Sequence, residues 1–322
     1  MDAALSMLAG NLLAPTILFF ILGLAAAMAR SDLSMPEGAA KIMSIYLLFA
    51  IGFKGGANLI SNGFGWQTMA TLGAGAVLSF ILPFIAFYLL KLMTRLDDLN
   101  AAAVAGHYGS ISIVTFVTAT SLLELNGIYA EGYLVAVAAV MEVPAILSAL
   151  WIAGSKGNAT QSKKKLTRDI LGNGSIVLLV GSFVIGAITG EAGLKDLDPF
   201  IVVPFTGILC LFLLDMGLSA GRSILENRQS LTKGLFAFGV LMPLVGSLTG
   251  YAAGLIVGLS EGGIFLLMVL SASASYIAVP AAMKIALPKA QSGIYLTMSL
   301  GVTFPFNIAI GLPLYLFIAT AQ

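Results

Sequence analysis

The stretch Gly106-His-Tyr-Gly-Ser-Ile-Ser112 interrupts a long apolar segment with small polar residues, and Ser271-Ala-Ser-Ala-Ser-Tyr276 interrupts another in the second half of the chain. In the hydrocarbon core of a bilayer, unwound backbone is tolerated only where it is buried in protein or lines a water-filled cavity. Two such breaks at matching places are typical of the binding site of a secondary transporter. We therefore expect broken helices here, with free backbone groups available to a ligand.

The composition predicts an all-α integral membrane protein. Of 322 residues, 59% are hydrophobic and 10% are charged, and the mean hydropathy is +1.00. A helix needs about 20 apolar residues to cross a bilayer, and we expect about ten such transmembrane helices. They cover 12–29, 42–60, 68–90, 100–123, 133–153, 174–190, 200–220, 234–257, 263–285 and 292–319. The fourth and ninth contain the two breaks.

The basic residues give an independent check on the number of spans. Fourteen of the 16 Lys and Arg residues follow odd-numbered spans. Because Lys and Arg accumulate in cytoplasmic loops, this pattern predicts a multi-pass protein of the plasma (inner) membrane with both termini outside the cytoplasm.

The chain also repeats itself coarsely. Adding 165 to a residue number carries Gly52 onto Gly217, Gly56 onto Gly221 and Ser110 onto Ser275. Five spans per repeat is an odd number, so the two repeats have opposite orientations, as in many secondary transporters. The predicted organisation is a first repeat at 1–153, a cytoplasmic hinge loop at 154–173 and a second, inverted repeat at 174–322. The basic hinge either sets the topology or attracts lipid headgroups or a cytoplasmic regulator.

Several functional classes are excluded by what the sequence lacks. One His and one Cys cannot form a His/Cys metal cluster, and neither a GxxxxGK[ST] loop nor a GxSxG elbow is present. We therefore expect neither an enzyme nor a cofactor. The net charge of +1, without a basic domain, argues against nucleic acid as a partner. Transport powered by an ion gradient remains.

Five pieces of sequence carry a resemblance to a known family. They are Leu47-Leu-Phe-Ala-Ile-Gly-Phe-Lys-Gly-Gly56, the Gly106-x-x-Gly109 break followed by Ser112 and Thr115, Val143-Pro-Ala145, the break from Ser271 to Pro280, and the Gly- and Pro-rich last span. In their order and spacing the chain resembles the sodium-dependent bicarbonate transporter family, best known from cyanobacteria, over essentially its whole length.

The resemblance implies ten helices in a five-plus-five inverted repeat and a gate domain that moves against a core domain. It also implies sodium symport with bicarbonate, a homotrimer, and inhibition by a small PII-like cytoplasmic protein. Three positions depart from the cyanobacterial pattern: Tyr276 replaces an aspartate, Glu142 replaces another aspartate, and His107 replaces a small or apolar residue.

A small oxyanion binds well to backbone amides and hydroxyls at a helix N-terminus. The expected substrate-binding residues are Gly106, His107, Tyr108, Gly109 and Ser110 in the first break, with Ser273, Ala274 and Ser275 in the second. Close helix packing is the alternative role for the Gly and Ser residues. For His107 the alternatives are helix capping, titration or packing as a neutral ring.

Sodium is a hard cation and takes oxygen ligands. The expected sodium ligands are Ser112, Thr115, Glu142, Thr303 and Asn307. Glu142 could instead form a structural pair with a Lys or His. We further expect Lys54 to extend toward the headgroups, although it could instead neutralise the charge of the anion. Asp215 is expected to pair with Arg222, with attraction of sodium as the alternative.

Two other functions stay open. A sodium-coupled carrier of another small anion, such as a short carboxylate, would use the same scaffold, and Tyr276 and His107 favour it. A membrane sensor that transports nothing would keep the repeat without binding sodium.

Overall fold

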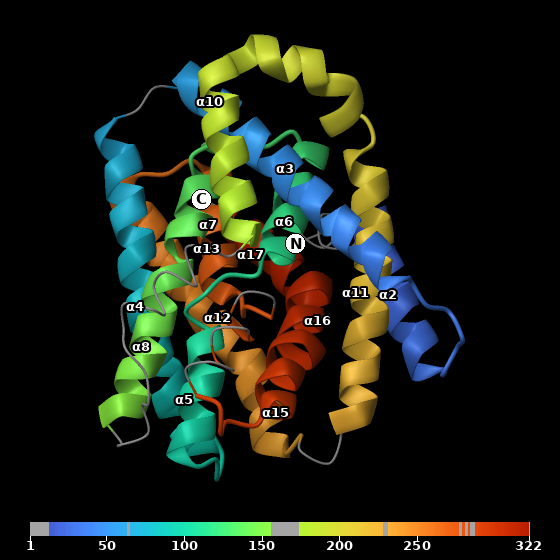
Figure 1. Ribbon diagram of the computed structural model, residues 1–322. Coiled ribbons are helices and arrows are strands. Elements are labelled where there is room, and N and C mark those ends of the chain that lie inside the picture. Colours follow the sequence, from blue (N-terminus) through green and yellow to red (C-terminus); the bar gives the residue numbers. More distant parts are fainter. Residues whose placement is uncertain are drawn as a thin grey trace.

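The computed structural model describes residues 13–62, 65–155, 174–227, 231–276, 279–280, 283 and 287–321. This part of the chain folds as a bundle of helices without strands (Figure 1), which confirms the all-α class. Seven helical runs are long and apolar enough to cross a membrane: Gly38–Ala57, Trp66–Met93, Leu134–Ala153, Val177–Ile201, Phe205–Asn227, Lys233–Val257 and Ser292–Thr320. The other three predicted ranges hold the shorter apolar helices Pro15–Met28, Ile113–Leu125 and Glu261–Ala272.

The elements before the predicted hinge are α2 (Pro15–Met28), α3 (Glu37–Asn62), α4 (Trp66–Met93), α5 (Asp98–His107), α6 (Ile113–Leu125), α7 (Leu134–Val140) and α8 (Glu142–Ser155). Those after it are α10 (Gly174–Ile201), α11 (Phe205–Asn227), α12 (Lys233–Val257), α13 (Glu261–Ala272), α15 (Ser292–Leu296), α16 (Phe304–Phe306) and α17 (Leu312–Thr320). The π-helical turns η1 (Thr297–Thr303) and η2 (Asn307–Gly311) join the last three into one helical run.

Side-chain caps fix where the short helices begin. The carboxylate of Asp97 accepts from the Asn100 amide at 2.9 Å to start α5, and the hydroxyl of Ser112 accepts from the Thr115 amide at 3.2 Å to start α6. Ser260 does the same for α13 through the Gly263 amide at 3.1 Å. Each cap satisfies an amide that the first helical turn leaves free. Burial would raise the pKa of Asp97, but its hydrogen bonds from Asn100 outweigh that effect and hold the pKa below its ordinary value.

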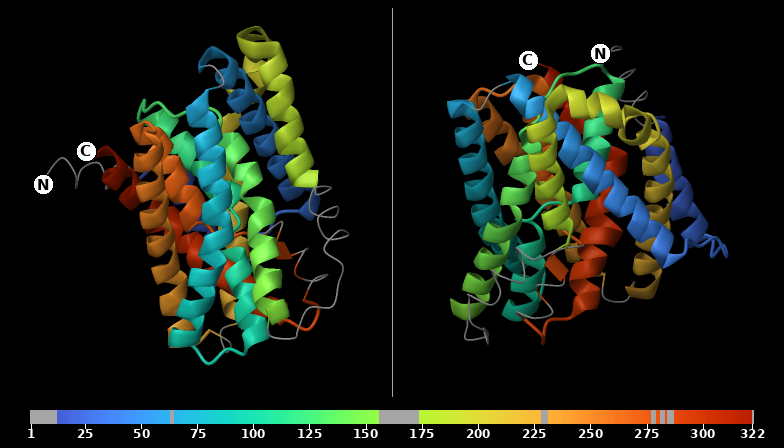
Figure 2. Two further views of the ribbon diagram at one scale, coloured as in Figure 1. Left: turned by 90° about the vertical axis from the view of Figure 1, so that its left-hand side faces the viewer. Right: turned by 45° about the horizontal axis from the view of Figure 1, so that its top comes forward.

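Four helices pack as two close pairs, α3 against α10 and α2 against α11. A side chain at Gly52 or Gly56 would overlap α10, and one at Gly217 or Gly221 would overlap α2. Such small residues allow helices to approach closely in membranes. We call these four helices the paired-helix unit and the remaining helices the broken-helix unit; the two views of Figure 2 show the units side by side.

The broken-helix unit is organised around α4 and α12. These two helices pack on each other, while α4 also packs on α5 and α8, and α12 packs on α13. Pro83 and Pro243 lie inside α4 and α12. The long helices therefore form the wall that supports the short helices α5 and α13.

Large apolar side chains remain exposed on the outer helices. Trp66, Tyr88, Ile188 and Ile256 are each more than half exposed. An extended apolar exterior of this kind indicates a lipid-facing surface, in agreement with a multi-pass membrane protein.

Two predicted boundaries differ from the structure. The polar stretch from Glu191 to Pro199 was expected to be a loop, but α10 continues through it to Ile201 after a kink at Gly190. Gly190 has φ 60° and ψ −150°, a conformation that glycine adopts most readily. At the predicted hinge, α8 extends to Ser155, and 156–173 lie outside the described residues.

Candidate functional site

The two broken segments cross in the interior of the molecule. The backbone amide of Ser275 donates to the backbone oxygen of His107 at 2.9 Å. His107 is the last residue of α5, and Ser275 follows the end of α13 at Ala272. The non-helical residues are fewer than predicted, because Gly106 and Ser271 still belong to their helices.

The first break joins α5 to α6 through Tyr108, Gly109, Ser110, Ile111 and Ser112, all of them buried. A side chain at Gly109 would overlap Pro83 of α4, so this glycine lets the break lie directly against that helix. The hydroxyl of Ser110 donates to the carboxylate of Glu142. The hydroxyl of Tyr108 lies 2.7 Å from that of Thr303.

The second break is attached to the last helical run. Asn307 donates from its side-chain amide to the backbone oxygen of Ala272 at 2.9 Å, and the Tyr315 hydroxyl donates to Asn307 at 3.0 Å. The Ser273 hydroxyl donates to the Val269 oxygen at 2.6 Å. Thus Asn307 satisfies one of the carbonyls left free at the end of α13.

Two helix C-termini and one N-terminus come together here. The carbonyl oxygens of α5 and α13 end at the crossing, and the free amides of α6 begin beside it. The carbonyl end of a helix dipole stabilises a cation, and the amide end stabilises an anion. The crossing therefore offers a place that favours a cation next to a place that favours an anion.

The five predicted sodium ligands form four separate groups of contacts. Ser112 accepts from the Thr115 hydroxyl at 2.8 Å, and Glu142 accepts from Ser110. Thr303 and Asn307 lie on or between the π turns of the last helical run, and Thr303 donates to the Gly239 oxygen at 2.7 Å. Among the described residues, Ser112 with Thr115 is the one direct hydrogen bond within the predicted set.

Unused hydrogen-bonding capacity is concentrated at the breaks. In the described part of the chain four buried side-chain atoms have no partner: His107 Nε2, Ser271 Oγ, Tyr276 Oη and Tyr133 Oη. Three of the four belong to the two interrupted stretches. A buried polar atom without a partner costs roughly 1–3 kcal/mol, so the three atoms at the breaks are candidates for contacts with a bound ligand or water. Ser271 and Tyr276 were missed as candidates, although both lie within the quoted motif.

The geometry of His107 defines its tautomer. Its Nδ1 lies 2.7 Å from the backbone oxygen of Ala103, and a carbonyl oxygen can only accept, so Nδ1 carries the proton. The ring stacks on Tyr295 with centroids 4.6 Å apart. No carboxylate in the described chain forms an ion pair with it. In the resulting neutral ring, Nε2 is an acceptor.

Tyr276 is placed by packing. Its ring lies 5.1 Å from that of Phe304 between centroids. Its hydroxyl lies near that of Ser112, the cap of α6. This position brings the second break to the amide end of α6.

Two charged residues have contacts that were not predicted. Lys54 forms an ion pair with Glu124, and its Nζ lies 4.9 Å from the centre of the Phe205 ring. Arg222 donates to the Leu33 oxygen at 2.8 Å. Its charge also acts on Asp215, as expected, although the two side chains form no ion pair within the described chain. The partners in the contacts of Lys54 with Glu124 and of Arg222 with Leu33 are far apart in the sequence, so local patterns do not predict either contact.

A comparison with protein families identifies the family of the chain. A model of the Na⁺-dependent bicarbonate transporter superfamily matches residues 15–320. The chain belongs to this family. No significant match was found among curated proteins. This family is one of transporters rather than of enzymes. By its description, bicarbonate is the substrate of the family and sodium is the coupling ion.

Proposed function

We propose that this protein is a symporter that imports bicarbonate together with sodium through the plasma membrane by alternating access. The hydrogen bond from Ser275 to His107 carries the proposal, because it joins the two breaks. The two segments also carry three of the four buried side-chain atoms that have no partner in the described chain. Such crossed broken helices hold the substrate in many secondary transporters.

The anion site is assigned to the amide end of α6 and the adjoining breaks. Tyr108, Gly109 and Ser110 supply main-chain groups from one side, with Gly106 allowing close approach. Ser273, Ala274 and Ser275 supply them from the other. To these predicted residues we add Ser271 and Tyr276, whose buried hydroxyl groups meet the criteria for a hydrogen bond with no other atom of the described chain.

Sodium is assigned to the carbonyl ends of α5 and α13. Glu142, Thr303 and Asn307 contact the breaks or the residues beside them, and Ser112 and Thr115 add hydroxyl oxygens at the start of α6. Hard oxygen donors of this kind suit a sodium ion. Its charge would also offset that of the anion nearby.

In the sequence His107 favoured a carrier of short carboxylates, but the contacts of its ring favour bicarbonate. Bicarbonate carries one O–H group, whereas the formate and acetate anions carry no hydrogen-bond donor of that kind. A buried neutral Nε2 needs such a donor. A carboxylate would leave this acceptor unpaired at the full cost of its burial.

Motion of the paired-helix unit against the broken-helix unit provides alternating access. When the repeat 1–153 is aligned with the repeat 174–322, α3 corresponds to α11 and α2 corresponds to α10. The α3–α10 pair is therefore equivalent to the α11–α2 pair. The glycines at the first pair, Gly52 and Gly56, correspond to Gly217 and Gly221 at the second, and all four lie in the contacts. These matching contacts support a five-plus-five inverted repeat of ten helices, joined by a hinge at 154–173.

Orientation follows from the basic residues, with both termini outside the cytoplasm. A homotrimer and a PII-like regulator, which the family resemblance implies, stay predictions.

The test is uptake of labelled bicarbonate into proteoliposomes with and without an inward sodium gradient, at fixed pH and membrane potential. We expect sodium-stimulated accumulation by the unaltered protein. Ser110→Ala should lower uptake at least about tenfold, since a hydrogen bond to a charged group is worth roughly 1.5–3 kcal/mol. Glu142→Gln should raise the sodium concentration needed for half-maximal uptake about tenfold.

Ser182→Ala is the matched control, because this buried serine bonds only to carbonyls of its own helix α10. Equal uptake by Ser110→Ala and Ser182→Ala would contradict the site assignment. Uptake of formate but not bicarbonate would favour the short-carboxylate carrier. Folded, inserted protein that moves neither anion would favour a membrane sensor.

A further inference from the structure

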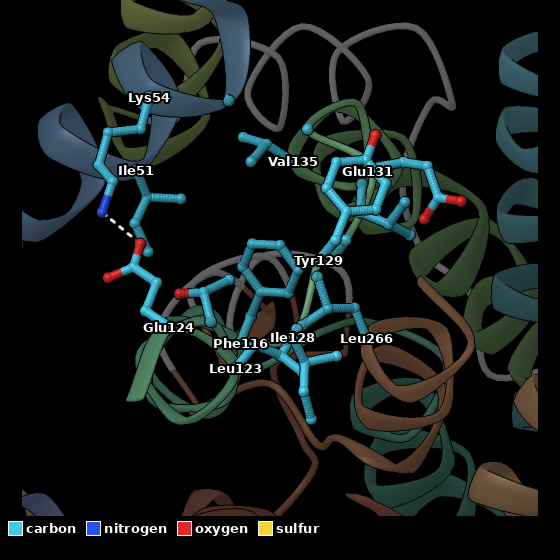
Figure 3. Close-up of a pocket in the computed structure, with 15 residues that line it drawn as sticks. Ile51, Lys54, Phe116, Leu123, Glu124, Ile128, Tyr129, Glu131, Val135 and Leu266 are labelled. Carbon is cyan, nitrogen blue, oxygen red and sulfur yellow. Dashed lines mark hydrogen bonds and ion pairs between the residues drawn. The ribbon is translucent and has the colours of Figure 1, made fainter. Parts of the chain in front are cut away.

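An open pocket of about 390 Å³ lies between the two units, away from the crossing (Figure 3). One wall is α3 of the paired-helix unit, with Ile51, Lys54 and Gly55. The facing wall comes from α6, the link 128–132, the start of α7 and Leu266 of α13. The pocket therefore belongs to the boundary that the proposed motion would change.

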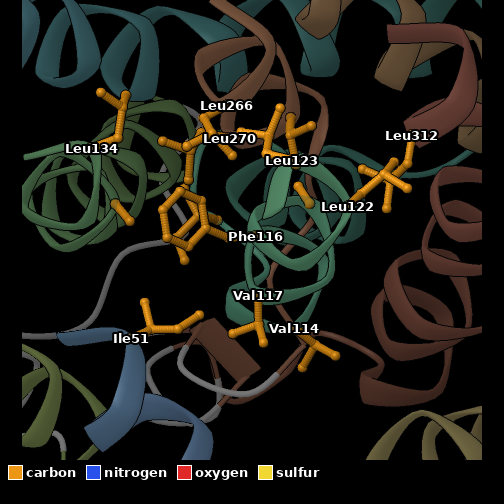
Figure 4. Packing of buried hydrophobic residues seen from close by; sticks show 14 of the residues in the cluster. Ile51, Val114, Phe116, Val117, Leu122, Leu123, Leu134, Leu266, Leu270 and Leu312 are labelled. Carbon is orange, nitrogen blue, oxygen red and sulfur yellow. The ribbon is translucent and has the colours of Figure 1, made fainter. Parts of the chain in front are cut away.

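The pocket leads toward the first break along one face of α6. Phe116, Thr120, Leu123 and Glu124 line it, and their spacing places them on the same side of a helix. Phe116 stands one turn, about 6 Å, beyond the Ser112 cap. It is fully buried among Leu134, Leu266 and Leu270 (Figure 4), so it closes the pocket at the end nearest the break.

Lys54 is the one basic residue among those that line the pocket. It donates to Glu124, and this ion pair connects the two units. The side chain of Lys54 is 17% exposed and that of Glu124 is 52% exposed. Glu124 can therefore turn into water, whereas the Phe205 ring and the pocket wall hold the ammonium group in place.

The second carboxylate of the pocket is already engaged. Glu131 accepts from the Ser260 amide at 2.8 Å and from the Ser260 hydroxyl at 2.9 Å. Figure 3 shows its carboxylate turned away from Lys54. Glu124 alone thus neutralises Lys54 inside the pocket.

We propose that this pocket is an outer binding site for a small planar oxyanion, in which the carboxylate of Glu124 occupies the anion position until the anion displaces it. Bicarbonate and a glutamate side chain each present a planar CO₂ group with one negative charge to the ammonium donor. A partly exposed ion pair is weak, so a small anion at millimolar concentration can replace it. Displacement would also break the contact between α3 and α6. The inference rests on the proposed function for the identity of the anion.

Binding can be measured separately from transport. Thr120→Cys, made in a Cys210→Ser background, places a thiol in the pocket, and its rate of modification by a charged thiol reagent is followed in sodium-free buffer. Bicarbonate replaces gluconate at constant ionic strength and pH. We expect bicarbonate to slow modification at least threefold, and Lys54→Gln to abolish this protection while Lys54→Arg retains it.

Glu124→Gln provides the decisive variant. Without the competing carboxylate, protection should require about fivefold to tenfold less bicarbonate. Glu261→Gln, which removes an exposed carboxylate in the first turn of α13, is the matched control and should leave the concentration unchanged.

The proposal would be overturned if bicarbonate protected Lys54→Gln as well as the unaltered lysine. It would also be overturned if Glu124→Gln needed the same or a higher bicarbonate concentration for protection. Because no sodium gradient is applied, protection does not depend on symport. Protection without bicarbonate uptake supports the outer site and removes the proposed symport. Uptake without protection would support the proposed symport and exclude the outer site.

Discussion

His107 combines complete burial with one satisfied and one unsatisfied ring nitrogen. The satisfied nitrogen fixes the tautomer, and stacking on Tyr295 fixes the ring. A free acceptor held this rigidly distinguishes ligands by whether they carry a donor. If the anion contacts Nε2, as proposed above, the position of this single proton would decide which small anions the site accepts.

Replacing His107 by Phe should weaken discrimination while preserving the aromatic stack. We expect the apparent affinity for bicarbonate to fall up to about tenfold, the net worth of one neutral hydrogen bond. Inhibition by formate should stay the same or strengthen, because no buried acceptor is left unpaired. Competition of formate against labelled bicarbonate in proteoliposomes measures the ratio of the two apparent affinities.

Tyr295→Phe keeps the ring beneath His107 and is the control for packing. An unchanged ratio of bicarbonate to formate affinity in His107→Phe would show that Nε2 does not contact the anion.

The helices are held together most closely where glycines allow backbone contact. A side chain at Gly56 would overlap the backbone oxygen of Phe183 on α10. Gly56→Val should therefore lower the free energy of unfolding by roughly 1–3 kcal/mol, as overpacking usually does. Unfolding in detergent by heat or denaturant measures this.

Gly181→Ala on α10 is the corresponding control. Nothing lies within 4 Å of the added Cβ, and alanine favours a helix by about 1 kcal/mol over glycine. This variant should be neutral or more stable. If Gly56→Val behaved like Gly181→Ala, close α3–α10 packing would not be important for stability.

The positions of the elements could be predicted where composition changes abruptly. Apolar runs located the spans, and the small polar residues from Tyr108 to Ser112 located the first break. The helix after Gly190 could not be predicted, because its charged residues resemble those of an exposed loop. Contacts such as Lys54 with Glu124 and Ser275 with His107 join residues far apart in the sequence, so local patterns do not specify them.

The whole molecule is asymmetric in charge from one end to the other. In the view of Figure 1 the ends of α4 and α11 and the start of α12 lie at the lower end. These termini carry Lys91, Arg222 and Lys233. The positive-inside rule assigns this end to the cytoplasm.

Single cysteines test that orientation. In a Cys210→Ser background, Lys195→Cys should react with a membrane-impermeant maleimide on intact cells. Arg95→Cys, between α4 and α5, should react only after permeabilisation. The converse labelling pattern would require the opposite orientation of the protein in the membrane.

The π turns η1 and η2 give the last helical run an angular phase that a regular α-helix would not have. Each residue advances an α-helix by about 100°, and a π turn accommodates an additional residue without ending the helix. A chain shorter by one residue in η1 could continue as an ordinary helix, but Asn307 and Tyr315 would then face different neighbours. Such a chain would keep its hydropathy and its number of spans. It would nevertheless lose the hydrogen bond from Asn307 to Ala272. The support of the second break therefore depends on the register of this one helix.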